Sequence, residues 1–195
     1  GTQAYLGRAL ADQGRNVVLV VPDQATLTEL GSLTRIMTDK RPEAPFWDRS
    51  LVSFPPFVPG KMDFKLWAQR WASLFTLAES SQPKVTILTA DNLLPLWPSR
   101  RVAEQAYEFV IKGSEMSQDE FLDRAVSWGY ERVSMVTRPG ELSVRGDIID
   151  IFAPGYDHPL RLELFGNLLE SIRLFEALSQ RSRQDVDEAV ILPVA

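Results

Sequence analysis

The strongest constraint on the fold is an alternation of strand and helix patterns in the first part of the chain. Apolar, β-branched runs occupy residues 17–21, 51–54 and 84–90, and helical spacing occupies residues 2–14, 24–37 and 63–78. The first and third runs are continuously apolar, which is typical of strands buried on both faces. Strands separated by helices of this length require right-handed crossovers, so we expect a parallel, doubly wound α/β sheet.

Local end signals support these helices. Gly14 follows the first helical segment, and Asp63 precedes the third in the position of an N-cap. Asp23 and Asp91 follow strand signals, where catalytic acids often lie, but each precedes a helical pattern, which favours a capping or turn role. The first helical segment is expected to bury one apolar face, made of Tyr5, Leu6, Ala9 and Leu10.

The pattern changes near residues 112–116, where we place a domain boundary. Ser117 and Glu120 form a capping box that opens one helix, and Gly129 closes it. Only strand signals follow: residues 132–137 turn at 138–141 into 142–152, and residues 160–176 form a hairpin that turns near Gly166-Asn167. This domain is therefore expected to be α+β with antiparallel strands.

The last strand signal, "AVILPV", has no further element after it. We expect a strand there to rejoin the parallel sheet, which indicates that the chain is a fragment of a longer protein. The predicted organisation is a domain of residues 1–114, a smaller domain of residues 115–186, and a strand of residues 187–195 that returns to the first domain.

Composition narrows the functional classes. The 195 residues include no cysteine, which excludes disulfides, thiolate zinc sites and a cysteine nucleophile and fits a reducing cytoplasm. No apolar run approaches the roughly 20 residues of a membrane span. Residues 115–195 carry 8 arginines and no lysine against 15 acidic residues (−7), whereas residues 1–114 carry 13 basic and 11 acidic residues (+2). An acidic segment is repelled by nucleic acid, and arginine without lysine is typical of protein interfaces. The alternative is that this distribution of charged residues arose by chance.

Motifs for catalysis are missing. The phosphate-binding pattern GxxxxGK[ST] does not occur, and the nearest approximation, around Lys61 in "FVPGKMDF", lacks the upstream glycine. The single histidine, His158, lies in a loop beside a proline and supports neither a shared metal site nor a Ser-His-Asp triad. We therefore expect no catalytic residue, metal or cofactor in this chain.

Alternation in two strand segments predicts a binding face. Leu160, Leu162 and Leu164 share one face of "LRLELF". If these leucines form the core, the outer face presents Arg161, Phe165, Arg173 and Phe175. Arginine and aromatic side chains together are typical of interface hot spots. The alternative is that the arginines lie beside phenylalanines that pack under a loop.

Residues 128–193 resemble a known family. "GYERVSMVTRPGELSVRGDIIDIFAPG", "LRLELFGNLLESIRLFE" and the final "ILPV" follow the order of the second domain shared by the nucleotide-excision helicase UvrB and the transcription-repair coupling factor Mfd. The segments "VVLVVPD", "SFPPFVPGKMDFKLWAQRWASLF" and "VTILTADNL" resemble, more loosely, the first domain of the coupling factor. The resemblance implies a degenerate helicase-like (P-loop-type) parallel-sheet domain followed by a smaller α+β domain.

Two departures from the UvrB pattern favour the coupling factor. Gly1-Thr2-Gln3 falls where UvrB has Gly-Lys-Thr, so threonine replaces the essential lysine of the phosphate loop. A short segment without tyrosine separates "LVSF" from the long helix, where UvrB inserts a tyrosine-rich hairpin that clamps DNA. The resemblance therefore implies a module without ATP hydrolysis, with ATP, RNA polymerase and DNA engaged by other domains of a longer protein.

The resemblance also implies a partner. In both families the second domain docks on UvrA, and the docking residues of the coupling factor correspond to Arg145, Arg161 and Phe165. Together with Arg173 from the outer face, these form the predicted UvrA-binding set. The predicted function is a non-catalytic, cytoplasmic adaptor that recruits nucleotide excision repair to stalled RNA polymerase. The alternative is a fragment of a UvrB-type ATP-dependent DNA helicase.

The triplet Arg145-Gly146-Asp147 invites a separate interpretation as a cell-adhesion tag. The absence of cysteine and of a signal-peptide pattern argues against adhesion. We instead expect Arg145 to bind the partner, Gly146 to form a bulge that aims this arginine, and Asp147 to be a strand or turn residue without a special role.

Overall fold

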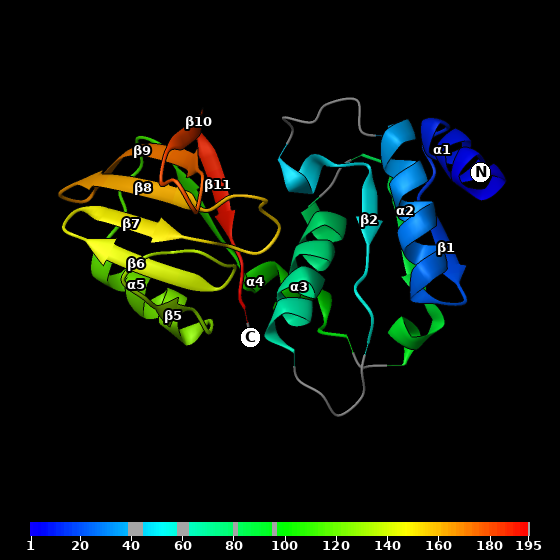
Figure 1. The fold of residues 1–195 in the computed structure, drawn as a ribbon, viewed down its shortest axis with the longest axis horizontal. Helices are drawn as coiled ribbons and strands as arrows, with labels where there is room; N and C mark the ends of the chain where they lie inside the picture. Colours follow the sequence, from blue (N-terminus) through cyan, green and yellow to red (C-terminus); the bar gives the residue numbers. More distant parts are fainter. Residues whose placement is uncertain (39–44, 58–62, 80–81, 95–96, 195) are drawn as a thin grey trace. The chain divides into compact units, whose positions relative to one another are not determined.

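The computed structural model describes residues 1–38, 45–57, 63–79, 82–94 and 97–194 (Figure 1). Internal contacts divide the chain into a first unit, Gly1–Glu104, and a second unit, Gln105–Ala195. The boundary lies earlier than the predicted position because the strand β4 (Glu108–Ile111) pairs with β11 (Glu188–Ile191), so residues 105–114 belong to the second unit.

The first unit is a parallel sheet with helices. Its elements are α1 (Thr2–Asp12), β1 (Val17–Val21), α2 (Gln24–Thr38), the 3-10 helix η1 (Phe46–Asp48), β2 (Leu51–Ser53), α3 (Phe64–Glu79), β3 (Val85–Thr89), the 3-10 helix η2 (Ala90–Leu93) and α4 (Arg100–Gln105), which crosses the boundary. The strand order is β1-β3-β2, with both outer strands parallel to β3. The predicted mixed α/β class with a parallel sheet is confirmed at this level.

The burial of the strands differs from the expectation at β1. All five residues of β3 are buried, as a central strand requires. In β1, however, Val18 and Val20 are 60% and 53% exposed, whereas Leu19 and Val21 pack into the core. The strand β1 lies at the edge of the described sheet, and only one of its faces contacts this core, so its continuous apolar run does not imply two buried faces.

The helix α1 buries small residues rather than large ones. The predicted apolar face is wrong, because Tyr5 and Leu6 are 65% and 55% exposed while Ala4 and Gly7 are buried. A Cβ atom added to Gly7 would lie 3.4 Å from a side-chain methyl of Val85. The helix thus approaches the sheet closely enough that only small side chains fit between them.

Polar side chains at the predicted helix starts act as caps. The Asp23 carboxylate accepts a hydrogen bond from the Thr26 backbone N–H at 2.8 Å, and the Asp63 carboxylate accepts from Lys65 and Leu66. Asp91 lies within η2. These positions fit the favoured capping and turn roles.

The second unit is α+β. Its further elements are α5 (Gln118–Ser127), β5 (Glu131–Arg132), β6 (Glu141–Arg145), β7 (Ile148–Ile151), β8 (Leu160–Phe165), β9 (Leu168–Phe175) and β10 (Ser182–Val186). A six-stranded sheet has the order β10-β9-β8-β7-β6-β5, antiparallel except for the β5–β6 pair (Figure 1). Ser117 caps α5, its hydroxyl accepting from the Glu120 backbone N–H at 3.4 Å.

Two strand predictions in this unit are wrong. The Val133 backbone N–H still bonds to Leu142 O of β6, but residues 134–137 do not continue β5, and the Thr137 backbone N–H bonds to the Glu141 carboxylate instead of a neighbouring strand. The expected return of residues 187–195 to the parallel sheet also fails. The strand β11 pairs antiparallel with β4, which the sequence analysis did not identify because it has only four residues. Within the described residues, no helix is both long and apolar enough to cross a bilayer.

Candidate protein-binding surface

The predicted binding residues lie on three strands, β6, β8 and β9, of the six-stranded sheet. Arg145 ends β6, Arg161 and Phe165 belong to β8, and Arg173 belongs to β9. In the strand register Asp150 of β7 is opposite Arg161, which is opposite Arg173. Directly opposed residues point to the same face of a sheet, so these three charges form a row across β7, β8 and β9.

The other face of β8 enters the core, as alternation predicted. Leu160 and Leu162 are fully buried and Leu164 is 5% exposed. The face that carries the row of charges is called the arginine face from here on. It comprises Arg145, Asp150, Arg161, Glu163, Arg173 and Asp185.

A single buried carboxylate holds two arginines of the arginine face. Asp150 is 1% exposed and accepts hydrogen bonds from Arg161 Nε at 2.6 Å and Arg161 Nη2 at 2.8 Å. It also accepts from Arg145 Nη2 at 2.7 Å. Charge-assisted bonds of this kind, one of them bidentate, are the strongest hydrogen bonds in proteins. Two cations on one anion leave this group with a net positive charge.

Arg161 is held from two further directions. Its guanidinium lies 4.6 Å over the ring of Phe175, and Nη2 donates to the side-chain oxygen of Gln180 at 3.2 Å. The hydrogen bonds with Asp150 are the first cause of the raised pKa of the Arg161 guanidinium, which burial partly opposes. Arg161 is therefore a fixed cation, and its side chain is only 17% exposed.

Phe175 is not on the outer surface. The prediction that it is exposed is wrong: its ring is fully buried beneath Arg161. The loop after β9 folds back on itself, with the Gln180 backbone N–H donating to Glu176 O at 2.7 Å. The alternative that the outer-face phenylalanines are covered thus applies to Phe175, which packs under Arg161, and not to Phe165.

Phe165 is the exposed aromatic residue of the surface. Its side chain is 73% exposed, and it lies opposite Leu168, which is 41% exposed, across the predicted hairpin turn. The turn residue Gly166 has φ +59°, a conformation that glycine adopts readily and that suits a two-residue hairpin. The β8–β9 hairpin therefore ends in an apolar tip.

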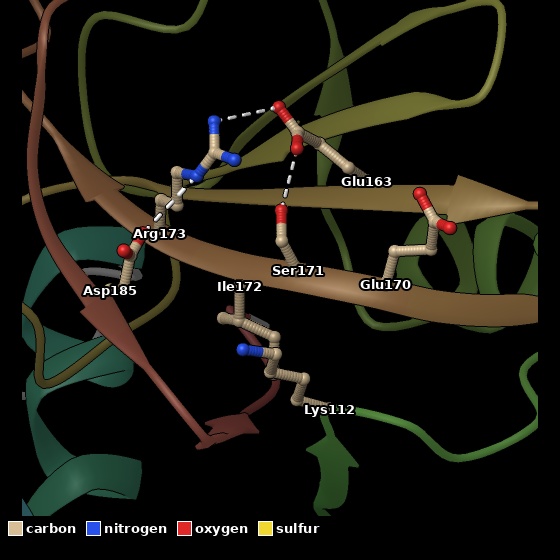
Figure 2. A pocket seen from close by; sticks show the side chains of 7 residues that line it. All are labelled: Lys112, Glu163, Glu170, Ser171, Ile172, Arg173 and Asp185. Atoms are coloured by element: carbon tan, nitrogen blue, oxygen red, sulfur yellow. Dashed lines mark hydrogen bonds and ion pairs between the residues drawn. The ribbon is translucent and has the colours of Figure 1, made fainter.

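Arg173 belongs to a separate ion-pair group. It bonds to Glu163 and to Asp185, each at 3.2 Å, and the Ser171 hydroxyl donates to Glu163 at 2.6 Å. Figure 2 shows these side chains around an open hollow that Lys112, Glu170 and Ile172 also line. Arg173 is 36% exposed and its partners are solvated, so these pairs contribute little to stability.

Arg145 precedes a tight turn rather than a bulge. It lies opposite Ile148, so only Gly146 and Asp147 connect the two strands. Gly146 has φ +59° and occupies the first of the two turn positions, which corrects the expectation of a bulge. Asp147 is an exposed turn residue, in line with its expected position, and Arg145 is 53% exposed.

The structure adds two residues that the sequence analysis did not single out. Asp150 and Gln180 contact Arg161 directly, although Gln180 lies 19 positions further along the chain. The sequence signal for Asp150 was a single acidic residue within the apolar run "IIDIF". Gln180 had no signal beyond ordinary loop composition.

Other chemical centres are scarce in the part of the chain that the structure describes. No group of three or more His, Asp or Glu side chains is arranged to hold a metal ion there. His158 lies partly exposed in the loop between β7 and β8. Lys61, the nearest approximation to a phosphate-loop lysine, falls outside the described residues.

Comparison with known proteins shows which family this surface resembles. A family model described as the UvrB interaction domain matches residues 110–195, which include all four predicted binding residues. The matched residues all lie in the second unit. Transcription-repair-coupling factors of Myxococcus xanthus and Staphylococcus aureus (strain MSSA476) are each 36% identical to the chain, over 71% and 65% of its length.

These matches confirm the resemblance to an N-terminal module of the transcription-repair coupling factors, with a second domain shared with UvrB. The aligned regions cover 12% and 11% of the two relatives. The chain thus spans about an eighth of the length of the coupling factors that it matches.

Proposed function

We propose that the chain is a non-catalytic adaptor module that binds UvrA through its UvrB interaction domain. The contact residues are Arg145, Arg161 and Phe165, with Arg173 at the edge of the surface. One observation carries the proposal: a strongly exposed phenylalanine shares a sheet face with two arginines held on one buried carboxylate.

The physical chemistry of this surface suits a protein partner. A large exposed aromatic side chain gains free energy by entering an apolar pocket, and arginine gives directional, forked bonds to carboxylates. Residues 115–195 carry a net charge of −7 (8 against 15), which disfavours nucleic acid as the partner of this unit.

The first unit has a supporting role in this proposal. Its parallel sheet is compatible with a degenerate helicase-like domain, and Gly1-Thr2-Gln3 lacks the lysine that a phosphate loop requires. In a longer coupling factor, ATP, RNA polymerase and DNA would be engaged by other domains. The module would then recruit nucleotide excision repair to stalled RNA polymerase in the cytoplasm.

Binding of purified UvrA, measured by calorimetry, tests the proposal. Phe165→Ala and Arg161→Ala are each expected to weaken binding by about 2 kcal/mol, or roughly 30-fold. Leu178→Ala and Arg132→Ala are matched controls, because Leu178 is 87% exposed and Arg132 is an exposed arginine on β5. Unchanged affinity in both test variants would refute the assignment, and ATP hydrolysis by the chain would favour the helicase alternative.

A further inference from the structure

Asp150 is an unusual residue for the middle of a sheet. It lies on β7 between Ile149 and Ile151, which are both fully buried, and its own exposure is 1%. A buried carboxylate is strongly unfavourable unless cations and hydrogen-bond donors compensate it. Arg145 and Arg161 supply both, from the strands on either side of β7.

The hydrogen-bond geometry ties the two arginines together. Nη2 of Arg145 and Nη2 of Arg161 both donate to the same oxygen, Oδ2 of Asp150, at 2.7 and 2.8 Å. Two guanidinium groups this close would repel each other without an anion between them. Asp150 therefore sets the separation and the orientation of the pair.

The restraints leave a defined set of donors free. Within the described residues, Nη1 of Arg161 and both Nε and Nη1 of Arg145 make no hydrogen bond to the protein. The partly exposed Arg145 and the fixed Arg161 thus present N–H groups from adjacent positions on the arginine face. Carboxylate oxygens are the acceptors that match such a pair.

We propose that Asp150 is a positioning residue that presents Arg145 and Arg161 as a rigid pair to a carboxylate group on UvrA. Long side chains lose rotamer freedom when they bind, and a surface that is already ordered avoids this loss. Asp150 orders both arginines before the partner arrives. This inference rests on the proposed function for the identity of the partner, but the ordering itself is a property of the free module.

Asp150→Asn tests the proposal with little change in volume. Asparagine lacks the charge and has one acceptor oxygen, so its amide N–H₂ faces arginine donors. The matched control is Asp147→Asn, the same change at an exposed position of the adjoining turn. Two quantities are measured: the NMR signals of the arginine Nε–H groups in the free module, and the affinity for UvrA.

The expected result has three parts. Asp150→Asn keeps a native backbone amide spectrum, loses the protected Nε–H signal of Arg161, and binds UvrA about tenfold more weakly. Asp147→Asn changes none of these. An affinity loss with unaltered arginine signals would contradict positioning, and unaltered signals and affinity together would overturn the proposal.

A second variant covers the case in which Asp150→Asn does not fold. Gln180 has φ +57°, a conformation that asparagine tolerates, so Gln180→Asn keeps the backbone conformation while its shorter amide releases both Arg161 and Ala177 O. This variant is expected to loosen the Arg161 signal and to weaken binding about threefold. Full affinity with a loosened Arg161 would refute the proposal. If the wild-type chain fails to bind UvrA, the proposed function is refuted. The NMR signals of the arginine Nε–H groups then decide alone whether Asp150 orders Arg145 and Arg161.

Discussion

Replacing Glu141 by glutamine measures how much of the stability of the second unit depends on one buried carboxylate. Oε2 of Glu141 accepts hydrogen bonds from the Thr137 backbone N–H at 2.7 Å, the Thr137 hydroxyl at 3.0 Å and the Arg138 backbone N–H at 3.0 Å. Oε1 accepts from Arg138 Nε at 2.8 Å. The residue is 6% exposed, so these bonds largely replace water.

The magnitude follows from what glutamine retains. Its single oxygen can keep the bonds at the Oε2 position, but they lose the assistance of the negative charge, and the amide N–H₂ faces Arg138 Nε–H. Hydrogen bonds to charged groups contribute about 1.5–3 kcal/mol and neutral ones about 0.5–1.5 kcal/mol. Arg138 is 68% exposed and can bond to water instead, so the expected loss is about 2 kcal/mol at pH 7.

The effect depends on pH in a defined direction. Burial acts to raise the pKa of Glu141, but the hydrogen bonds from Thr137 and Arg138 outweigh it and hold the pKa below its ordinary value. A carboxyl group with a lowered pKa in the folded state stabilises fully above its unfolded pKa of about 4.3. This contribution is lost as the pH falls through the folded-state pKa.

The assay is urea denaturation followed through backbone amide NMR signals of residues 105–195, so that the second unit is observed separately. Wild type and Glu141→Gln are compared from pH 7 to pH 3, and the difference is expected to shrink toward zero at the acid end. Glu131→Gln is the matched control, because Glu131 pairs with the same arginine but is 66% exposed; its effect should stay below about 0.5 kcal/mol. A difference independent of pH, or equal in both variants, would refute the reasoning.

Two further predictions concern stability. The buried Tyr130 hydroxyl donates to Leu192 O at 2.7 Å. Tyr130→Phe should therefore lower the free energy of unfolding in urea titrations by about 1–2 kcal/mol, because the buried carbonyl loses its donor. An unchanged free energy of unfolding would contradict this prediction. Gly140 has φ +89° and a Cβ there would lie 3.0 Å from a Val194 methyl, whereas Gly146 has φ +59° and open space around it. Both substitutions have a conformational cost of about 1–2 kcal/mol, but only Gly140→Ala adds a steric clash. Gly140→Ala should therefore lower the melting temperature more than Gly146→Ala, and the reverse order would exclude the steric argument.

The predictions from sequence succeeded where local pattern is sufficient. Alternation in β8 identified the buried leucines and the exposed Phe165, and the Gly166-Asn167 dipeptide located the hairpin turn. The capping role of Ser117 was also visible in the sequence. These features depend on neighbours within a few residues, so a single segment of chain contains the information.

The failures share a different cause. Phe175 was predicted to be exposed because its position in β9 points to the arginine face, but the guanidinium of Arg161, which Gln180 helps to hold, covers it. The pairing of β11 with β4 joins segments about 80 residues apart, and neither segment has a local pattern that identifies its pairing partner.

The sequence by itself determined the alternation of buried and exposed residues in β8, the hairpin turn at Gly166-Asn167 and the family resemblance, because hydrophobic periodicity and backbone preferences act over short distances. Only the tertiary structure decided that Arg145 and Arg161 share Asp150, since that contact requires the register of three strands. A buried charge must find its partners wherever the sheet brings them. The residues proposed to bind were thus recognisable in the chain, but the carboxylate that holds them in place became apparent only in the folded sheet.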